Sequence, residues 1–186
     1  NRMYIFTHNN YEGGKDESRE LLAFAMDAYQ EIADVRPRRK GEELVSMIEI
    51  GEKGKPFIPG WQHFSVSHSE NTWVVVFDDY ECGIDVQYEK EAKFEALARK
   101  CFASEDIEAA LESPSEFYRF WARKEAAAKA IGEGVMTELP SVSDNTIMMN
   151  GDEWHMFDIE LLGTEDGCHA ALCANMIPLE IHYYGI

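Results

Sequence analysis

Residues 63–87 read HFSVSHSENTWVVVFDDYECGIDVQ, and this stretch contains the pattern that decides the fold. Segments 63–69 and 72–78 are short, rich in β-branched and aromatic residues, and separated by a polar turn. In 83–87, Ile84 and Val86 share one strand face while Asp85 and Gln87 share the other. The stretch therefore predicts strands of one sheet, with two polar side chains next to each other on the last strand.

The segments on either side extend this pattern in both directions. Apolar spacing predicts helices over 17–34, about 89–102 and 115–131, the last one stopped by Gly132. Further strands are expected at 44–50, 146–149, 154–162, 169–174 and 179–184, with an Asn150-Gly151 hairpin turn after the second of these. This order predicts an α+β protein with two similar halves, at about 1–82 and 83–186, and not a doubly wound βαβ series.

Composition narrows the possible partners and the compartment. The chain of 186 residues has 17 basic and 35 acidic residues, a net charge of −18, which argues against a nucleic-acid partner. Apolar runs such as Trp73 to Phe77 are too short to span a membrane, and no basic-then-apolar leader opens the sequence. The four cysteines show no CxxC spacing, so we expect reduced thiols in a cytoplasmic protein.

A first candidate cluster combines Lys55, held between Gly54 and Pro56, with Ser67 and His68 on the predicted strand 63–69. A lysine, a hydroxyl and a histidine near a strand end can together hold phosphate oxygens. The alternative is a histidine with a merely structural, hydrogen-bonded role.

A second and a third cluster carry carboxylates. Asp85 and Gln87 offer oxygen ligands that suit a hard cation such as magnesium, although they could equally form the solvent-facing side of a half-buried strand. Glu125 and Lys129 lie one helical turn apart, so one helix can present a metal-binding carboxylate and a phosphate-binding ammonium. The alternative for this pair is an ordinary exposed ion pair.

In this order, the clusters resemble the signature of the Sfp-type 4'-phosphopantetheinyl transferases. The matching motifs are G-K-P at 54–56, F-S-V-S-H-S at 64–69, G-I-D-V-Q at 83–87 and W-A-R-K-E-A-A-A-K-A-I-G-E-G at 121–134. The resemblance covers residues 54–134, and the flanks agree only in element order and approximate length.

The resemblance implies two pseudo-twofold-related α+β halves, each a small antiparallel sheet packed with helices, with coenzyme A between them. It also implies roles for individual residues. Asp85 and Glu125 would bind magnesium, with Gln87 as a further ligand, directly or through water. The residues that would bind coenzyme A are Lys55, Ser67, His68, Lys124 and Lys129, and the catalytic residues would be Glu125, Asp85 and Lys129. Many relatives have glutamate where this chain has Gln87, so we expect weaker magnesium binding here.

The implied activity is that of a holo-acyl-carrier-protein synthase. Such an enzyme moves 4'-phosphopantetheine from coenzyme A to a serine of an acyl- or peptidyl-carrier protein, with magnesium as cofactor, and releases adenosine 3',5'-bisphosphate. Two halves in one chain predict a working monomer. Two alternatives stay open: a non-catalytic module of the same fold that binds coenzyme A or a carrier protein, and an unrelated metal-dependent hydrolase using His63, His68 and Asp85.

Overall fold

The computed structural model describes residues 1–134 and 136–186. The elements follow in the order β1 (Arg2–His8), α1 (Lys15–Ile32), α2 (Gly41–Ser46), β2 (Glu49–Ile50), β3 (Pro56–Phe57), β4 (His63–Ser69), β5 (Thr72–Asp78), β6 (Cys82–Tyr88), α3 (Phe94–Cys101), the 3-10 helix η1 (Ser104–Asp106), α4 (Ile107–Ala110), α5 (Pro114–Ala130), β7 (Thr146–Met149), β8 (Asp152–Ile159), β9 (Cys168–Ala174) and β10 (Glu180–Gly185).

The strands form two four-stranded sheets and a small hairpin. The first sheet has the order β10-β1-β5-β4, the second has the order β6-β9-β8-β7, and β2 pairs with β3. All pairings are antiparallel except that of β1 with β10, which is parallel. The protein is therefore α+β with sheets packed against helices, as the sequence predicts.

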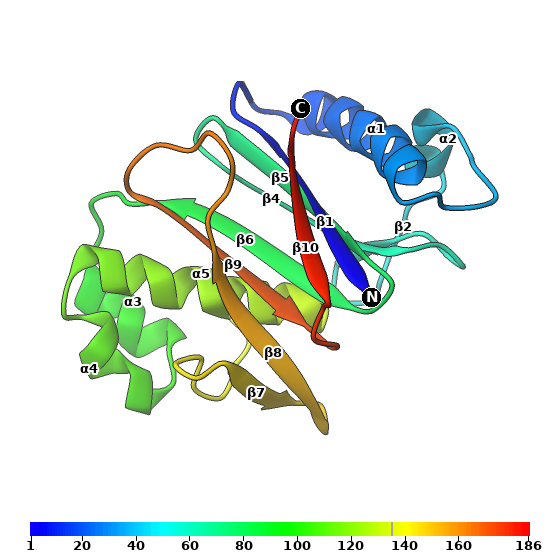
Figure 1. The fold of residues 1–186 in the computed structure, drawn as a ribbon. Helices are drawn as coiled ribbons and strands as arrows, with labels where there is room; N and C mark the ends of the chain where they lie inside the picture. The colour runs from blue at the N-terminus through cyan, green and yellow to red at the C-terminus, as the bar shows by residue number, and fades with distance from the viewer. Residues whose placement is uncertain (135) are drawn as a thin grey trace.

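The two sheets share a core between them, and helices cover their outer faces. In Figure 1, α1 and α2 lie beside the first sheet, whereas α5 runs along the second sheet below β6 and β9. The core between the sheets contains apolar side chains from both: Met3, Ile5, Val74, Val76, Ile84, Val86, Ala170 and Leu172. Because β5 has the first helix layer on one face and the second sheet on the other, all seven of its residues are buried.

Helix α5 is the element that carries most of the candidate site residues, and local signals define both of its ends. Ser113 accepts a hydrogen bond from the backbone N–H of Glu116, and Pro114 occupies the first turn, where no N–H partner is needed. Gly132 has φ of 74°, a left-handed conformation that ends a helix at little cost for glycine. The predicted helix 115–131 and its glycine stop are confirmed.

Several other predicted elements are also confirmed. Strands β4, β5 and β7 have the predicted bounds, and β6, β8, β9 and β10 differ from prediction by one to three residues at either end. The Asn150-Gly151 turn has φ of 52° and 82° at its two residues, the left-handed pair that a tight hairpin between β7 and β8 requires.

The strand prediction for 44–50 is wrong. Residues 41–46 form α2, and only Glu49–Ile50 is a strand. Leu44 and Val45 pack into the core beside α1, and a side chain at Gly41 would overlap the backbone of Ala23, so α2 lies directly on α1. A short apolar run cannot distinguish strand from helix by periodicity alone, and this tertiary contact decides it.

Further differences from the predictions concern where elements begin, which elements are present and how β10 pairs. The helix predicted from about residue 89 begins at Phe94, β1 has no counterpart among the predicted strands, and η1 and α4 follow α3. Strand β10 comes from the end of the chain but pairs with β1 in the first sheet. The division into halves at about 1–82 and 83–186 stays a prediction, and β10 crosses it.

Among the described residues, no helix combines the length and the apolar character needed to cross a lipid bilayer. Cys82, Cys101 and Cys173 are buried free thiols, and Cys168 is a half-buried one.

Candidate active site

Three alternate serines on β4 join the two sheets along one edge. The Oγ atoms of Ser65, Ser67 and Ser69 accept hydrogen bonds from the backbone N–H groups of Ile84 (3.1 Å), Val86 (3.1 Å) and Tyr88 (3.0 Å). The side chains face the neighbouring strand because β4 alternates, as predicted. Strand β6 is thereby held in a fixed register against β4.

Gly83 lets α5 lie directly on β6. A Cβ atom at this position would overlap the carbonyl oxygen of Ala126 and the backbone nitrogen of Ala130. Asp85 is two residues further along β6, so its side chain emerges on the same face, toward α5. There the Lys129 Nζ donates a hydrogen bond to Asp85 Oδ1 at 3.0 Å.

Asp85 is the buried centre of this cluster, with 6% of its surface exposed. Its Oδ1 accepts hydrogen bonds from Lys129 and from the Ser67 hydroxyl, the latter at 3.1 Å. Its Oδ2 is buried and has no hydrogen-bond partner among the described residues. Burial raises the pKa of Asp85 above its ordinary value, although Lys129 and Ser67 oppose this increase by stabilising the carboxylate.

Glu125 lies one turn before Lys129 on α5. Burial raises its pKa to about 7, and the negative charge of Asp85 adds to the increase. Lys129 and Lys124 oppose it. The two carboxylates are therefore close enough to repel each other across a partly buried site.

Gln87 lies on the same face of β6 as Asp85 and is half-buried. Its Nε2 donates a hydrogen bond to the carbonyl oxygen of Tyr88 at 2.9 Å. Among the described residues, no group of three or more histidine, cysteine, aspartate or glutamate side chains forms a metal-binding cluster. The structure thus brings together two carboxylates and an adjacent amide.

Lys55 lies beside this cluster, at the end of α5. Its Nζ donates to the carbonyl oxygens of Cys82 (3.1 Å) and Ala130 (3.0 Å), so it connects the start of β6 to the last turn of α5. Burial lowers the pKa of Lys55. An ammonium has three donors, which leaves one N–H of Lys55 for a ligand.

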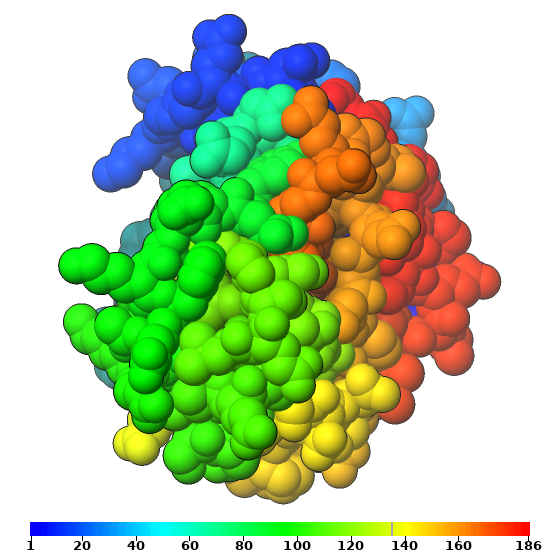
Figure 2. Space-filling model, turned by 90° about the vertical axis from the view of Figure 1, so that its left-hand side faces the viewer, coloured from blue at the N-terminus to red at the C-terminus, as the bar shows by residue number. Residues whose placement is uncertain are grey.

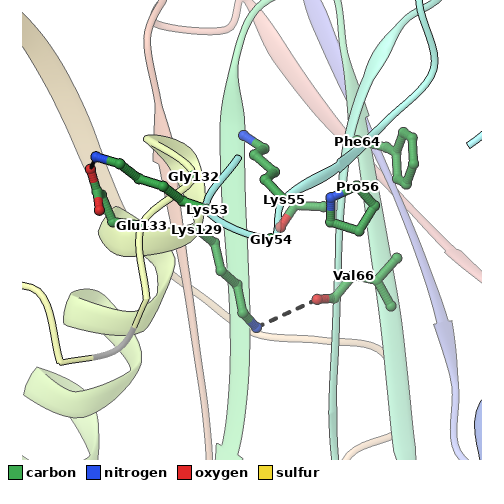
Figure 3. A pocket seen from close by; sticks show the side chains of 10 residues that line it. Lys53, Gly54, Lys55, Pro56, Phe64, Val66, Lys129, Gly132 and Glu133 are labelled. Atoms are coloured by element: carbon green, nitrogen blue, oxygen red, sulfur yellow. Dashed lines mark hydrogen bonds and ion pairs between the residues drawn. The ribbon is translucent and has the colours of Figure 1, made fainter. Parts of the chain in front are cut away.

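A pocket of about 220 Å³ lies between the β2–β3 hairpin, β4 and the end of α5. Figure 3 shows Lys129 reaching the carbonyl oxygen of Val66 (3.4 Å), with Pro56 and Phe64 on one side of the pocket. On the side away from Phe64, the Nζ of Lys53 donates to the Glu133 carboxylate. The pocket is thus apolar in part and has lysines at its rim.

His68 and Lys124 are directed elsewhere. His68 is exposed on the face of β4 opposite Ser67, with its ring 5.2 Å from that of Tyr11. Lys124 donates to the carbonyl oxygen of Cys101, and burial lowers its pKa. It lines a separate pocket of about 580 Å³ beside α3, together with Arg99, Lys100, Phe102 and Leu139.

The space-filling view shows how the segments of the chain are arranged on one face of the molecule. Figure 2 shows the N-terminal residues in blue above the α3 to α5 region in green, with later strands in orange and red beside them.

Sequence reasoning brought Asp85, Glu125, Lys129 and Lys55 together as the structure does. It missed the serine bridges to β6, for which the alternation of Ser65, Ser67 and Ser69 was the signal.

Half of the chain is similar to a known protein family. Residues 81–174, about half of the chain, match the family described as the 4'-phosphopantetheinyl transferase superfamily. This segment includes Asp85 on β6 and both Glu125 and Lys129 on α5.

Individual curated proteins are also similar to this chain in sequence. The chain is 33% identical over 99 residues to the 4'-phosphopantetheinyl transferase Sfp of Bacillus subtilis (strain 168), covering 50% of this chain and 44% of the relative. It is 30% identical over 139 residues to psf-1 of Bacillus pumilus, covering 63% and 59%. It is 31% identical over 152 residues to gsp of Aneurinibacillus migulanus, covering 75% and 63%.

The aligned regions span roughly half to three-fifths of the length of these relatives. The family match includes the strand and the helix that meet at Asp85, and the structure has the α+β organisation expected from the motifs. The chain therefore belongs to the 4'-phosphopantetheinyl transferase superfamily.

Proposed function

We propose that this protein transfers 4'-phosphopantetheine from coenzyme A to a serine of an acyl- or peptidyl-carrier protein, in a magnesium-dependent reaction that releases adenosine 3',5'-bisphosphate. Family membership supports the reaction class. The observation that carries the proposal is the meeting of Asp85 on β6, which is buried, with Glu125 and Lys129 on α5, which are half-buried.

The donor set fits a hard divalent cation. Asp85 has a buried carboxylate oxygen without a partner among the described residues, and the charge of Asp85 raises the pKa of Glu125. A cation between two such carboxylates would give the unpartnered oxygen of Asp85 a ligand and would offset the repulsion between the two negative charges. Gln87 would add an amide oxygen, directly or through water. When bound, magnesium would supply positive charge that neutralises the diphosphate oxygens of coenzyme A.

The lysines of the site would hold the diphosphate. Lys55 and Lys129 each use two donors on protein oxygens, so each ammonium is fixed in position with one N–H left for a phosphate oxygen. Fixed charges of this kind stabilise a transition state without reorganising during the reaction. His68, which is exposed on β4, would contact the 3'-phosphate of coenzyme A. Lys124 donates to the carbonyl oxygen of Cys101 and lines a separate pocket, so its expected contact with coenzyme A stays a prediction.

Glu125 would accept the proton of the carrier serine. The Glu125 carboxylate would take this proton directly or through a water molecule. In the transfer, the serine oxygen forms a bond to the phosphorus next to pantetheine. The bond between that phosphorus and the bridging oxygen breaks, and its electron pair leaves with adenosine 3',5'-bisphosphate, whose charge Lys129 and Lys55 would stabilise.

All of these groups come from one chain, so a monomer would suffice. We propose that the protein acts as a monomer in the cytoplasm, with coenzyme A as co-substrate. The carrier protein would dock beside the site. Because this chain has a net charge of −18, the contact would depend on local basic and apolar side chains and not on the overall charge.

Mass spectrometry of an apo carrier protein tests the proposal. Incubated with this protein, coenzyme A and magnesium, the carrier is expected to gain one phosphopantetheine, and chelation of the metal is expected to prevent the gain. Carriers from fatty-acid, polyketide and nonribosomal-peptide synthesis should each be tried. If none is modified although the protein binds coenzyme A, the non-catalytic binding module is the correct reading.

A further inference from the structure

The hydroxyl of Ser67 is used twice within the fold. Its Oγ accepts a hydrogen bond from the backbone N–H of Val86 and donates one to Asp85 Oδ1, both at 3.1 Å. The side chain is buried, with 5% of the residue exposed. A hydroxyl has a single proton, so this proton is committed to Asp85.

The neighbouring serines show what is special about Ser67. Ser65 and Ser69 accept the equivalent bonds from β6, but among the described residues neither donates to a carboxylate. All three therefore connect β4 to β6, and only the middle one also contacts Asp85. The connection between the strands and the contact with the carboxylate can be separated experimentally.

The bond from Val86 fixes the direction of the Ser67 proton. The N–H of Val86 occupies one lone pair of the Ser67 hydroxyl and so fixes this oxygen of β4 against β6. The hydroxyl proton is then directed at Asp85 Oδ1. Lys129 donates to the same oxygen from the opposite element, α5. Asp85 is thus held by donors from two sides through Oδ1, while Oδ2 has no partner among the residues that the structure describes.

We propose that Ser67 is a positioning residue that fixes the Asp85 carboxylate so that Oδ2 is presented to the cation. This rests on the proposed function, because it assigns a role in the same magnesium site. It replaces the direct phosphate contact expected for Ser67 from the sequence. A phosphate oxygen needs a donor, and Ser67 could offer its proton only by releasing Asp85.

The physical reason for an effect on affinity is preorganisation. A carboxylate held by hydrogen bonds in the binding orientation loses little freedom when it binds an ion, and such supporting partners commonly contribute about 10- to 100-fold to metal affinity. Without Ser67, Asp85 would keep the bond from Lys129 and could rotate about it.

The test compares Ser67→Ala with Ser69→Ala by isothermal titration of magnesium into the full chain saturated with coenzyme A. Each variant loses one serine bond to β6, and Ser67→Ala also loses the bond to Asp85, so its urea midpoint of unfolding should fall at least as far as that of Ser69→Ala. Ser67→Ala is expected to weaken magnesium binding by about tenfold or more. Ser69→Ala is expected to bind magnesium as the parent does, because Ser69 does not contact Asp85.

Equal magnesium affinity in Ser67→Ala and the parent would overturn the proposal, as would equal weakening in both variants. If Ser67→Ala does not fold, Ser67→Cys takes its place, since it fills nearly the same volume and a thiol is only a weak donor. Parent-like affinity in Ser67→Cys would then overturn it. A parent protein that does not bind magnesium would overturn the proposed function as well, whereas a parent that binds magnesium and transfers phosphopantetheine leaves that function standing.

Discussion

At the scale of single residues, the site depends on how each polar atom is already occupied. Lys129 shares its ammonium between Asp85 Oδ1 and the carbonyl oxygen of Val66, and Lys55 shares its own between the ends of β6 and α5. These bonds hold both positive charges in place before any ligand arrives. Among the described residues, Oδ2 of Asp85 has no hydrogen-bond partner.

Gln87→Glu is predicted to tighten magnesium binding, on the order of tenfold, because ligand charge tunes the affinity for hard cations over orders of magnitude. Glutamate cannot donate to the carbonyl oxygen of Tyr88, so the side chain would be released from its present bond and free to turn toward Asp85. Isothermal titration of both proteins measures the change. Unchanged or weaker binding would reject Gln87 as a position that contacts the metal or its water.

Asp78 is predicted to make folding stability depend on pH. It is fully buried, its Oδ1 accepts bonds from Asn1 and the Asp79 backbone, and burial raises its pKa from 3.8 to about 6. The folded state therefore binds this proton more tightly than the unfolded state does. The stabilisation by the proton is fully present below the unfolded pKa and is lost as the pH rises through about 6.

Asp78→Asn does not titrate, so its unfolding free energy relative to the parent should rise by about 1–3 kcal/mol between about pH 4 and about pH 7.5. Urea unfolding of both proteins at the two pH values measures this difference. A constant difference would show that Asp78 has the same pKa in the folded and unfolded states.

The sequence identified most of the central residues but not their partners. Asp85, Glu125 and Lys129 were predicted from motif spacing on a strand and a helix, and the structure brings them together. The directions of Lys124 and the Ser67 proton were not predictable. They depend on the Cys101 carbonyl oxygen and on Asp85, which become neighbours only through tertiary packing.

At the scale of elements, the contact of α5 with β6 is what makes the site. Gly83 has no side chain to separate the helix from the strand, and its Cβ position is occupied by the backbone of Ala126 and Ala130. Since Asp85 and Lys129 lie along this same contact, their 3.0 Å bond depends on how closely the two elements approach.

Gly83→Ala is predicted to destabilise the protein by about 1–3 kcal/mol or more, the cost of an extra group in a filled interior. It should also weaken magnesium binding, because α5 must move away from β6. Gly185→Ala, at the end of β10, is the control, since a Cβ there meets open space. Chemical unfolding measures stability; if both alanine variants had parental stability, the close contact would not be needed.

Elements were predictable where local pattern and packing agree. Strands β4 and β5 have the predicted bounds because alternation and a β-branched run leave one interpretation. Residues 41–46 formed a helix instead of a strand because Leu44 and Val45 pack beside α1, a tertiary contact with the preceding helix that periodicity does not show. Helix α3 began later than predicted because residues 89–93, all charged except Ala92, give it no apolar face to bury.

At the scale of the whole molecule, the two ends of the chain lie together in the first sheet. Strand β10 pairs with β1 in parallel, and in Figure 1 both run side by side beneath α1. No local pattern predicts such a pairing, because either strand could extend either sheet. The site lies instead where the two sheets meet, between β4 and β6, and Lys55, Asp85, Glu125 and Lys129 come from the middle of the chain.

The central claim is that Asp85 and Glu125 act together on one cation beside fixed lysines. It is tested most directly by the amount of phosphopantetheine that purified Asp85→Ala and Glu125→Ala variants add to an apo carrier, with intact protein mass as the measurement and circular dichroism confirming the fold. The account predicts no detectable transfer by either folded variant under conditions in which the parent modifies the carrier completely. Near-parental transfer by either one would contradict it.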